Sequence, residues 1–228
     1  MAVRINKYLA EHGYCSRREA DRLIDAGVVF VNGKRAVAGH QVEETDRVEV
    51  LNRRPKNQTE KVYFLLNKPA GYSTNLDRYT EKSVLKLVPS KLRLFPVGRL
   101  DVEASGLLIV TNDGELEKKL THQRYEHDVE YDIILDKCIG DGHMRSLTEG
   151  ITLGKKKTLP AIIKRQSDRE FSIIMQEGGP RQIRRMCNEL GYTVRTLTRT
   201  RIRTVKLGTL QEGKTRELTG TEISALKQ

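Results

Sequence analysis

The sequence lacks the features that would place it in a membrane or a secretory pathway. No apolar run among its 228 residues approaches the roughly 18 residues that a membrane-spanning helix needs. The N-terminus has no apolar signal segment either, because Arg4, Lys7 and Glu11 interrupt it. These absences predict a cytoplasmic protein that does not bind a membrane.

Residues with metal-ligand or cofactor-binding spacing are also missing. The three cysteines, Cys15, Cys138 and Cys187, form no Cys-x-x-Cys pair, and the five histidines are equally scattered. The sequence contains no Gly-x-Gly-x-x-Gly loop of the kind that binds a nucleotide cofactor. We therefore expect no metal site, and the missing glycine-rich loop argues against a methyltransferase.

Positive charge, in contrast, is in clear excess. Lysine and arginine number 41 against 30 acidic residues, which gives a formal net charge of +11 and a pI of about 9.6. Such an excess favours a polyanionic partner, and nucleic acid before a membrane, since no basic amphipathic helix with large apolar residues stands out. The charge alone does not indicate an activity.

Composition divides the chain into a small N-terminal domain, residues 1–51, a linker, residues 52–61, and a larger domain, residues 62–228. The linker is polar and charged and contains Pro55. In the larger domain, helical and strand patterns do not alternate strictly. This favours an α+β fold with a mixed, mainly antiparallel sheet flanked by helices.

The small domain has clear local signals. Two short helices are expected, and Ser16 and Glu19 have the spacing of a capping box at the start of the second one. Gly27 ends that helix, and Asn32-Gly33 is a strong signal for a hairpin turn.

The larger domain is organised around the stretch from Phe95 to Leu116. A proline and a glycine precede Asp101, so we expect this residue on a loop, and the apolar run from Gly106 to Thr111 predicts a buried strand after it. Catalytic groups are often found on loops that a rigid scaffold supports. A motif as short as Arg99-Leu100-Asp101 is common by chance, so a capping role or an ion pair with Arg99 is the alternative.

Two later segments of the larger domain are informative. Val129 to Leu135 is expected to form a strand that contains Tyr131. Residues 181–206 contain eight basic side chains and one acidic side chain. Arg199, Arg201 and Arg203 alternate with other residues, so a regular strand would present all three guanidinium groups on one face. We expect this face to contact RNA, with an ordinary solvated surface as the alternative.

The motifs of the small domain resemble the alpha-L RNA-binding domain, which occurs on several RNA-modifying enzymes. These motifs are Arg4-Ile5-Asn6-Lys7-Tyr8-Leu9, Ser16-Arg17-Arg18-Glu19-Ala20 and Gly27-Val28-Val29-Phe30-Val31-Asn32-Gly33. The resemblance implies binding of structured RNA and does not imply catalysis. A solvated helix pair with no RNA-binding role could carry the same charges.

Four blocks of the larger domain extend the resemblance to the bacterial ribosomal-RNA pseudouridine synthases that carry an alpha-L domain. The blocks are Asn67-Lys68-Pro69-Ala70-Gly71, then Gly98-Arg99-Leu100-Asp101 through Gly106-Leu107 to Thr111-Asn112-Asp113-Gly114, then Glu130-Tyr131, and finally Arg181-Gln182-Ile183-Arg184-Arg185-Met186. Each block is weak alone, but their order and spacing are specific. The resemblance implies isomerisation of a uridine in ribosomal RNA, with large-subunit RNA favoured. We expect the protein to be a monomer.

The resemblance also implies roles for individual residues. Asp101 corresponds to the essential carboxylate, which attacks the sugar or acts as a base. Tyr131 corresponds to the tyrosine that stacks on the target base. Arg184 corresponds to the cation that pairs with the carboxylate. The residues expected to contact the substrate RNA are Arg99, Lys68, Arg181, Arg185, Arg199, Arg201, Arg203, Arg4, Arg17 and Arg18.

The chemistry of the reaction is consistent with these residue types. Breaking a bond at an anomeric carbon requires an anionic carboxylate near developing positive charge. The target base must also leave its stack, and an aromatic platform restores about 1–3 kcal/mol per base. The reaction that the resemblance implies is redox-neutral and transfers no group, so we expect no cofactor and no metal. The alternative is a non-catalytic RNA-binding protein of ribosome assembly that uses the same basic surface, and the presence of Asp101, Tyr131 and Arg184 together argues against it.

Overall fold

The computed structural model describes every residue except 1, 54–59, 76–81, 122–127 and 177–180. Most of the predicted linker and the predicted loop Gly178-Gly179-Pro180 therefore lie outside the described residues. The chain forms two compact units, one of residues 1–61 with 90–93 and one of residues 62–89 with 94–228. No helix in the described part of the chain is long and apolar enough to cross a lipid bilayer.

The first unit packs two short helices against short strands. Strand β1 pairs with β4, and β3, β2 and β5 form a three-stranded antiparallel sheet. The buried side chains of the helices, among them Leu9 and Ile24, form one core with those of the strands. The elements are β1 (Val3–Arg4), α1 (Ile5–Glu11), α2 (Arg17–Asp25), β2 (Val29–Val31), β3 (Lys34–Arg35), β4 (Gln41–Val42) and β5 (Val48–Val50).

The local signals of this unit are largely confirmed. Asn32 and Gly33 both have positive φ, 50° and 77°, as a type I′ turn between β2 and β3 requires. The hydroxyl oxygen of Ser16 accepts the backbone N–H of Glu19 at 2.9 Å and so caps α2. The predicted capping box is only half formed, because the Glu19 carboxylate pairs with Arg53 at 2.8 Å instead of returning to Ser16.

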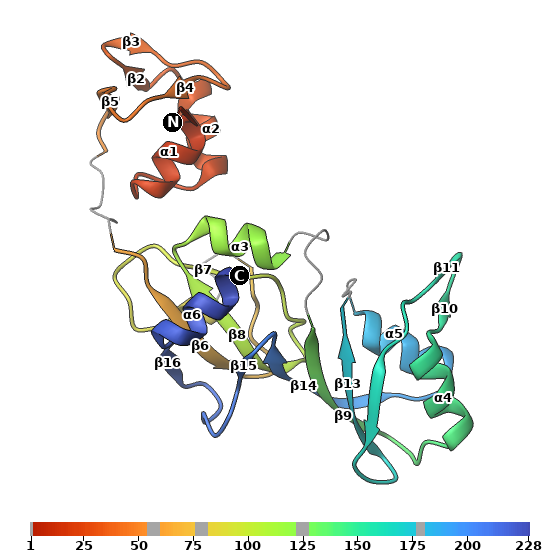
Figure 1. Ribbon diagram of the computed structural model, residues 1–228. Coiled ribbons are helices and arrows are strands. Elements are labelled where there is room, and N and C mark those ends of the chain that lie inside the picture. Colours follow the sequence, from red (N-terminus) through yellow and green to blue (C-terminus); the bar gives the residue numbers. More distant parts are fainter. Residues whose placement is uncertain (1, 54–59, 76–81, 122–127, 177–180) are drawn as a thin grey trace. The chain divides into compact units, whose positions relative to one another are not determined.

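The second unit is built on one nine-stranded sheet (Figure 1). The strands run in the order β12-β13-β9-β14-β8-β6-β16, with β15 paired to β14 and β7 paired to β8. The pair β14–β8 is parallel, and the other pairs that join described residues are antiparallel. The prediction of an α+β fold with a mixed, mainly antiparallel sheet is therefore confirmed.

The helices cover this sheet at its two ends (Figure 1). One core cluster joins β9, β13 and β14 to α4 and α5, and a second joins β6 and β8 to α3 and α6. The strands are β6 (Tyr63–Lys68), β7 (Phe95–Pro96), β8 (Ser105–Thr111), β9 (Val129–Leu135), β12 (Ile162–Arg165), β13 (Glu170–Met175), β14 (Val194–Ile202), β15 (Val205–Lys206) and β16 (Thr215–Glu217), with a separate hairpin of β10 (Thr152–Leu153) and β11 (Lys156–Lys157). The helices are α3 (Gly114–Thr121), α4 (Asp141–Glu149), α5 (Gln182–Glu189), α6 (Gly220–Lys227) and a short 3₁₀ helix, Val84–Lys86.

Strand β14 differs from its prediction. The expectation that Arg199, Arg201 and Arg203 share one exposed strand face is wrong. The pairing of β14 with β9 shifts register between Arg199 and Arg201, and such a bulge interrupts the alternation of side chains. Arg203 lies beyond the end of the strand and has a φ of 52°, so it belongs to the turn before β15. Sequence alternation cannot reveal an inserted residue of this kind.

Gly106 allows the parallel strands β8 and β14 to come unusually close. Its φ is +104°, and a Cβ atom at this position would lie 2.3 Å from the carbonyl oxygen of Arg199 and 2.7 Å from the backbone nitrogen of Arg199. Both contacts are with backbone, which cannot rotate away. The junction between the two halves of the sheet therefore depends on the missing side chain.

We expect Gly106→Ala to lower the free energy of unfolding by roughly 2–4 kcal/mol, because it adds a backbone clash to an unfavourable φ. Urea denaturation followed by circular dichroism measures this change. Gly154→Ala is the matched control, because Gly154 also has a positive φ, +68°, but has open space around its Cβ position. The control should lose only about 1–2 kcal/mol, and an equal loss in the two variants would contradict the close approach.

Candidate active site

Asp101 lies on the loop that leads from β7 into β8, as predicted. The residues on either side of it fix the loop in the core, since Leu100 is 6% exposed and Ala104 is fully buried. The N–H of Ala104 donates to the carbonyl of Asp101 at 3.0 Å, which closes a tight turn. Asp101 itself is half-buried at the rim of this turn. We define residues 98–104 as the Asp101 loop.

A fully buried ammonium group supports the Asp101 loop from inside. The Nζ atom of Lys68, at the end of β6, donates to the carbonyl oxygens of Val102 at 3.2 Å, Ala104 at 2.5 Å and Pro69 at 2.9 Å. Burial, together with the nearby charge of Arg199, lowers the pKa of Lys68 to about 8, and the carboxylate of Asp101 opposes this shift. Lys68 and Asp101 therefore attract one another electrostatically across the loop.

A second buried cation supports the same loop from β14. Arg199 is only 6% exposed. Its Nε donates to the carbonyl of Leu107 at 2.7 Å, and its Nη1 donates to the carbonyl of Arg99 at 3.3 Å. Its Nη2 is buried and has no hydrogen-bond partner among the described residues. The backbone is thus held by Arg199 before Asp101 and by Lys68 after it.

Two further hydrogen bonds reach carbonyl groups of the loop. Thr74 Oγ1 donates to the carbonyl of Leu100 at 3.4 Å, and the N–H of Gly71 donates to that of Val102 at 2.6 Å. Backbone groups removed from water must find such partners, so a loop with its carbonyls bound in this way has little freedom to move. The carboxylate of Asp101 is consequently carried on a rigid support.

The same core positions the other two predicted catalytic residues. Tyr131 is half-buried on β9, where its neighbours across the sheet are Arg199 on one side and Ile173 on the other. It packs against the core cluster that contains Leu100 and Ile183, the residues immediately before Asp101 and Arg184. One cluster therefore supports the elements that carry Asp101, Tyr131 and Arg184.

Arg184 contacts the Asp101 loop, but not at the predicted atom. Its Nη1 donates to the carbonyl of Val194 at 2.8 Å and its Nη2 to the carbonyl of Glu103 at 3.4 Å, while its Nε lies 3.6 Å from the Glu103 carboxylate. Arg184 and Asp101 form no ion pair in this structure, which corrects the predicted direct contact. Glu103, two residues further along, takes that place because its side chain reaches back towards α5.

Glu103 was missed by sequence reasoning. Its carboxylate pairs with Arg181 at 2.8 Å, and this hydrogen bond, with the charges of Arg181 and Arg184, lowers the pKa of Glu103. Arg181 itself has a φ of 53° at the start of α5. The only signal for these ion pairs in the sequence was the presence of an acidic residue two positions after the candidate catalytic carboxylate.

Two residues predicted to contact RNA are instead internal. Lys68 is fully buried and Arg199 nearly so, and both donate to backbone carbonyls. This corrects the expectation that they present their charge to the substrate. They are buried because the end of β6 and the centre of β14 both lie beneath the Asp101 loop.

The other predicted RNA contacts lie nearer to the surface. Arg201 is partly buried and pairs with Glu130 at 2.7 Å, and Arg203 donates to the carbonyl of Leu226 at 3.3 Å. Arg181 has half of its side chain exposed. The remaining members of the set are exposed, and they are Arg99 and Arg185 in the second unit, and Arg4, Arg17 and Arg18 in the first unit.

The described residues provide no group of three or more histidine, cysteine or carboxylate side chains that could hold a metal ion. Burial raises the pKa of Cys187 on α5 to about 12, so this thiol stays protonated and serves packing. The charged side chains that contact the backbone of the Asp101 loop are those of Lys68, Arg184 and Arg199.

Comparisons with known proteins identify the family of this chain. Residues 62–189 match the family model for RNA pseudouridylate synthase, and residues 3–48 match that for the S4 domain. The chain belongs to the RNA pseudouridylate synthase family. The matches confirm the resemblance that the motifs around Asp101 indicated, and the S4 match covers most of the predicted alpha-L domain.

Relatives that cover nearly the whole chain support the assignment. The chain is 39% identical over 224 residues to the dual-specificity RNA pseudouridine synthase RluF of Escherichia coli (strain K12), covering 97% of this chain and 77% of the relative. It is also 39% identical over 235 residues to the ribosomal large subunit pseudouridine synthase B of Bacillus subtilis (strain 168), covering 98% and 95%. A crystal structure described as a pseudouridylate synthase is 29% identical, with a TM-score of 0.72 over 98% of this chain and 99% of that chain.

The buried ammonium of Lys68 should make the stability of the enzyme depend on pH. Its pKa is about 8 in the folded protein and about 10.4 in an unfolded chain, so the unfolded state binds more protons between these two pH values. The free energy of unfolding should therefore rise with pH across this window, by up to about 3 kcal/mol from this group. Urea denaturation of wild type and Lys68→Met from pH 7.5 to 10 tests this, and an identical pH dependence in both proteins would contradict it.

Arg199 should affect the reaction more than the binding of RNA. Arg199→Met removes the hydrogen bond to the Arg99 carbonyl in the Asp101 loop and the one to the Leu107 carbonyl in β8. We therefore expect kcat to fall by roughly 10- to 100-fold. Because the guanidinium of Arg199 is buried, the RNA affinity of this variant and the salt dependence of that affinity should stay within about twofold of wild type.

Arg185→Ala is the contrasting variant, since it removes an exposed charge from α5. Its slope of log affinity against log salt concentration should become shallower by about 1. A change of the same size in the salt slope of Arg199→Met would show that Arg199 contacts phosphate after all.

Proposed function

We propose that this protein converts a uridine of ribosomal RNA, in the large subunit, into pseudouridine, and that Asp101 is the carboxylate that begins the reaction. The observation that carries the proposal is the fixed Asp101 loop, whose backbone is bound on both sides of Asp101 by Lys68 and Arg199. The name of the Bacillus subtilis relative supports large-subunit RNA as the substrate. We propose further that the enzyme acts as a monomer in the cytoplasm.

The reaction is an isomerisation that adds and removes no atoms. The bond between C1′ of the ribose and N1 of the uracil breaks, the base turns, and C5 forms a new bond to C1′. The proton on C5 leaves and N1 gains a proton, so the reaction is redox-neutral. Asp101 either attacks the ribose or removes a proton, and in both cases it must be ionised and held at a fixed position.

Tyr131 and Arg184 complete the proposed catalytic group. Tyr131 offers an aromatic face to the flipped uracil, which replaces part of the lost stacking energy. Arg184 already touches the backbone of the Asp101 loop through Glu103. We propose that it exchanges the Glu103 carboxylate for that of Asp101 when RNA phosphates approach, since Glu103 is more than half exposed and its attraction to Arg181 and Arg184 is open to competition.

Asp101→Asn tests the proposal. The substitution keeps the shape of the side chain but removes its negative charge, so we expect kcat to fall by roughly 1,000-fold or more. Unmodified large- and small-subunit ribosomal RNA are incubated separately with the protein, and pseudouridine is mapped by carbodiimide treatment followed by primer extension.

The folded state and RNA affinity of Asp101→Asn serve as controls, and both should match wild type. Full activity of this variant would exclude Asp101 as the reacting carboxylate. Tight binding of ribosomal RNA by wild-type protein without any new pseudouridine would favour the alternative, a non-catalytic RNA-binding protein of ribosome assembly.

A further inference from the structure

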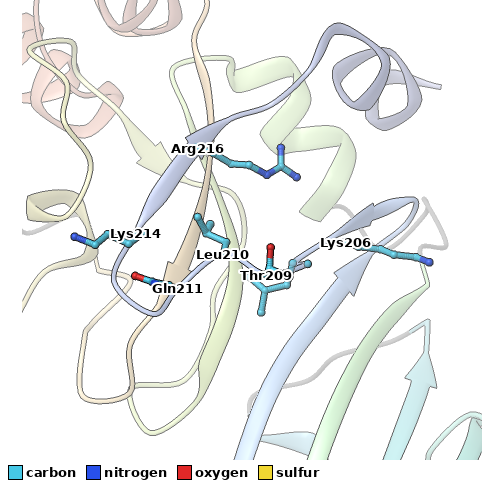
Figure 2. Close-up of a pocket in the computed structure, with 8 residues that line it drawn as sticks. Lys206, Thr209, Leu210, Gln211, Lys214 and Arg216 are labelled. Carbon is cyan, nitrogen blue, oxygen red and sulfur yellow. The ribbon is translucent and has the colours of Figure 1, made fainter.

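The segment that follows β15 forms a shallow hollow on the surface of the second unit (Figure 2). Its volume is about 510 Å³, and the residues that line it belong to one stretch of chain, from Lys206 to Arg216. Thr209, Leu210 and Gln211 occupy the middle of this stretch, and Lys206 and Lys214 lie at its two sides (Figure 2). No residue of the proposed catalytic group lines the hollow.

The hollow is firmly attached to the sheet. Asn67, in strand β6, donates from its side-chain amide to the carbonyl of Leu210 at 2.7 Å and from its backbone to the carbonyl of Lys214 at 3.0 Å. The carbonyl of Asn67 accepts the N–H of Gly213 at 2.8 Å. Since Asn67 directly precedes Lys68, the hollow is fixed in position relative to the buried ammonium beneath the Asp101 loop.

The charges around the hollow differ in how far they are neutralised. Arg216 forms a two-pronged ion pair with Glu222, with N–O distances of 2.8 and 2.7 Å, and this pair lowers the pKa of Glu222 to about 2. Arg216 therefore serves the structure of the unit. Lys206 and Lys214 are exposed, and neither forms an ion pair with another described residue.

We propose that this hollow is a docking surface for the phosphodiester backbone of the substrate RNA, outside the site that receives the target uridine. The two uncommitted ammonium groups point away from opposite sides of the hollow (Figure 2), which suits separate phosphates along a strand better than one small anion. The hydroxyl of Thr209 and the amide of Gln211, both exposed between them, can donate to phosphate or ribose oxygens. The stretch also contains one acidic residue, Glu212. Its carboxylate accepts a hydrogen bond from the N–H of Ala70 at 3.3 Å.

This inference rests on the proposed function, because it takes the substrate to be RNA. It adds a place where RNA that flanks the target is held. Contacts of this kind position a nucleic acid without reading its sequence. The rigid connection through Asn67 would let a phosphate contact at the hollow orient the RNA with respect to Asp101.

The test is the double variant Lys206→Ala/Lys214→Ala, assayed with a long ribosomal RNA fragment and with a minimal stem-loop around the modified uridine. With the long fragment, we expect KM and the dissociation constant to rise about tenfold and the salt slope to become shallower by about 1 to 2. The value of kcat at saturating RNA should stay unchanged. With the minimal stem-loop, both constants should stay within twofold of wild type.

The matched control is Lys86→Ala/Lys164→Ala, which removes two exposed charges from other parts of the same unit. Equal losses in the two double variants would mean that only net charge matters, and an unchanged affinity for the long fragment would mean that RNA does not reach the hollow. Either result overturns the proposal. Wild-type turnover, measured in the same assay, separately tests the proposed function, and thermal unfolding confirms that both double variants are folded.

Discussion

The arrangement around Asp101 depends on the burial of one ammonium group. Removing a charged group from water is costly unless all its donors find partners. Lys68 meets this requirement by donating to three backbone carbonyls, of which two, those of Val102 and Ala104, belong to the Asp101 loop. The loop and the cation therefore stabilise each other. A different loop conformation would leave the ammonium unsatisfied, and a different side chain would leave the carbonyls unsatisfied.

A glycine makes it possible to bring a second cation to the same place. Gly106 lets β8 approach the backbone of β14, and Arg199 on β14 then lies under the carbonyl of Arg99. Residues far apart in sequence are thus joined at one junction of the sheet. The two cations repel each other, which contributes to the lowered pKa of Lys68, and Asp101 partly offsets this repulsion. The proposed catalytic carboxylate of Asp101 is consequently a negative charge that partly offsets the two buried cations.

The excess of positive charge serves more than one purpose in this protein. Some cations are internal and hold backbone, as Arg199 does, while others are neutralised by a neighbouring carboxylate, as Arg216 is by Glu222. The exposed and uncommitted ones, among them Lys206 and Lys214, are the groups left to attract RNA. A count of basic residues in the sequence cannot separate these classes, because the distinction is one of burial and partners.

The sequence by itself determined the local elements and the chemical class of the protein. Strand β9 was predicted with its observed bounds, the turn at Asn32-Gly33 followed from backbone preference, and the motifs around Asp101 were sufficient to indicate the family. These features are encoded within a few neighbouring residues. Only the tertiary structure decided that Arg199 is buried, that Arg203 lies outside the strand and that Arg184 contacts Glu103 instead of Asp101. Those outcomes depend on a strand bulge and on contacts between distant segments, which alternation along a sequence does not record.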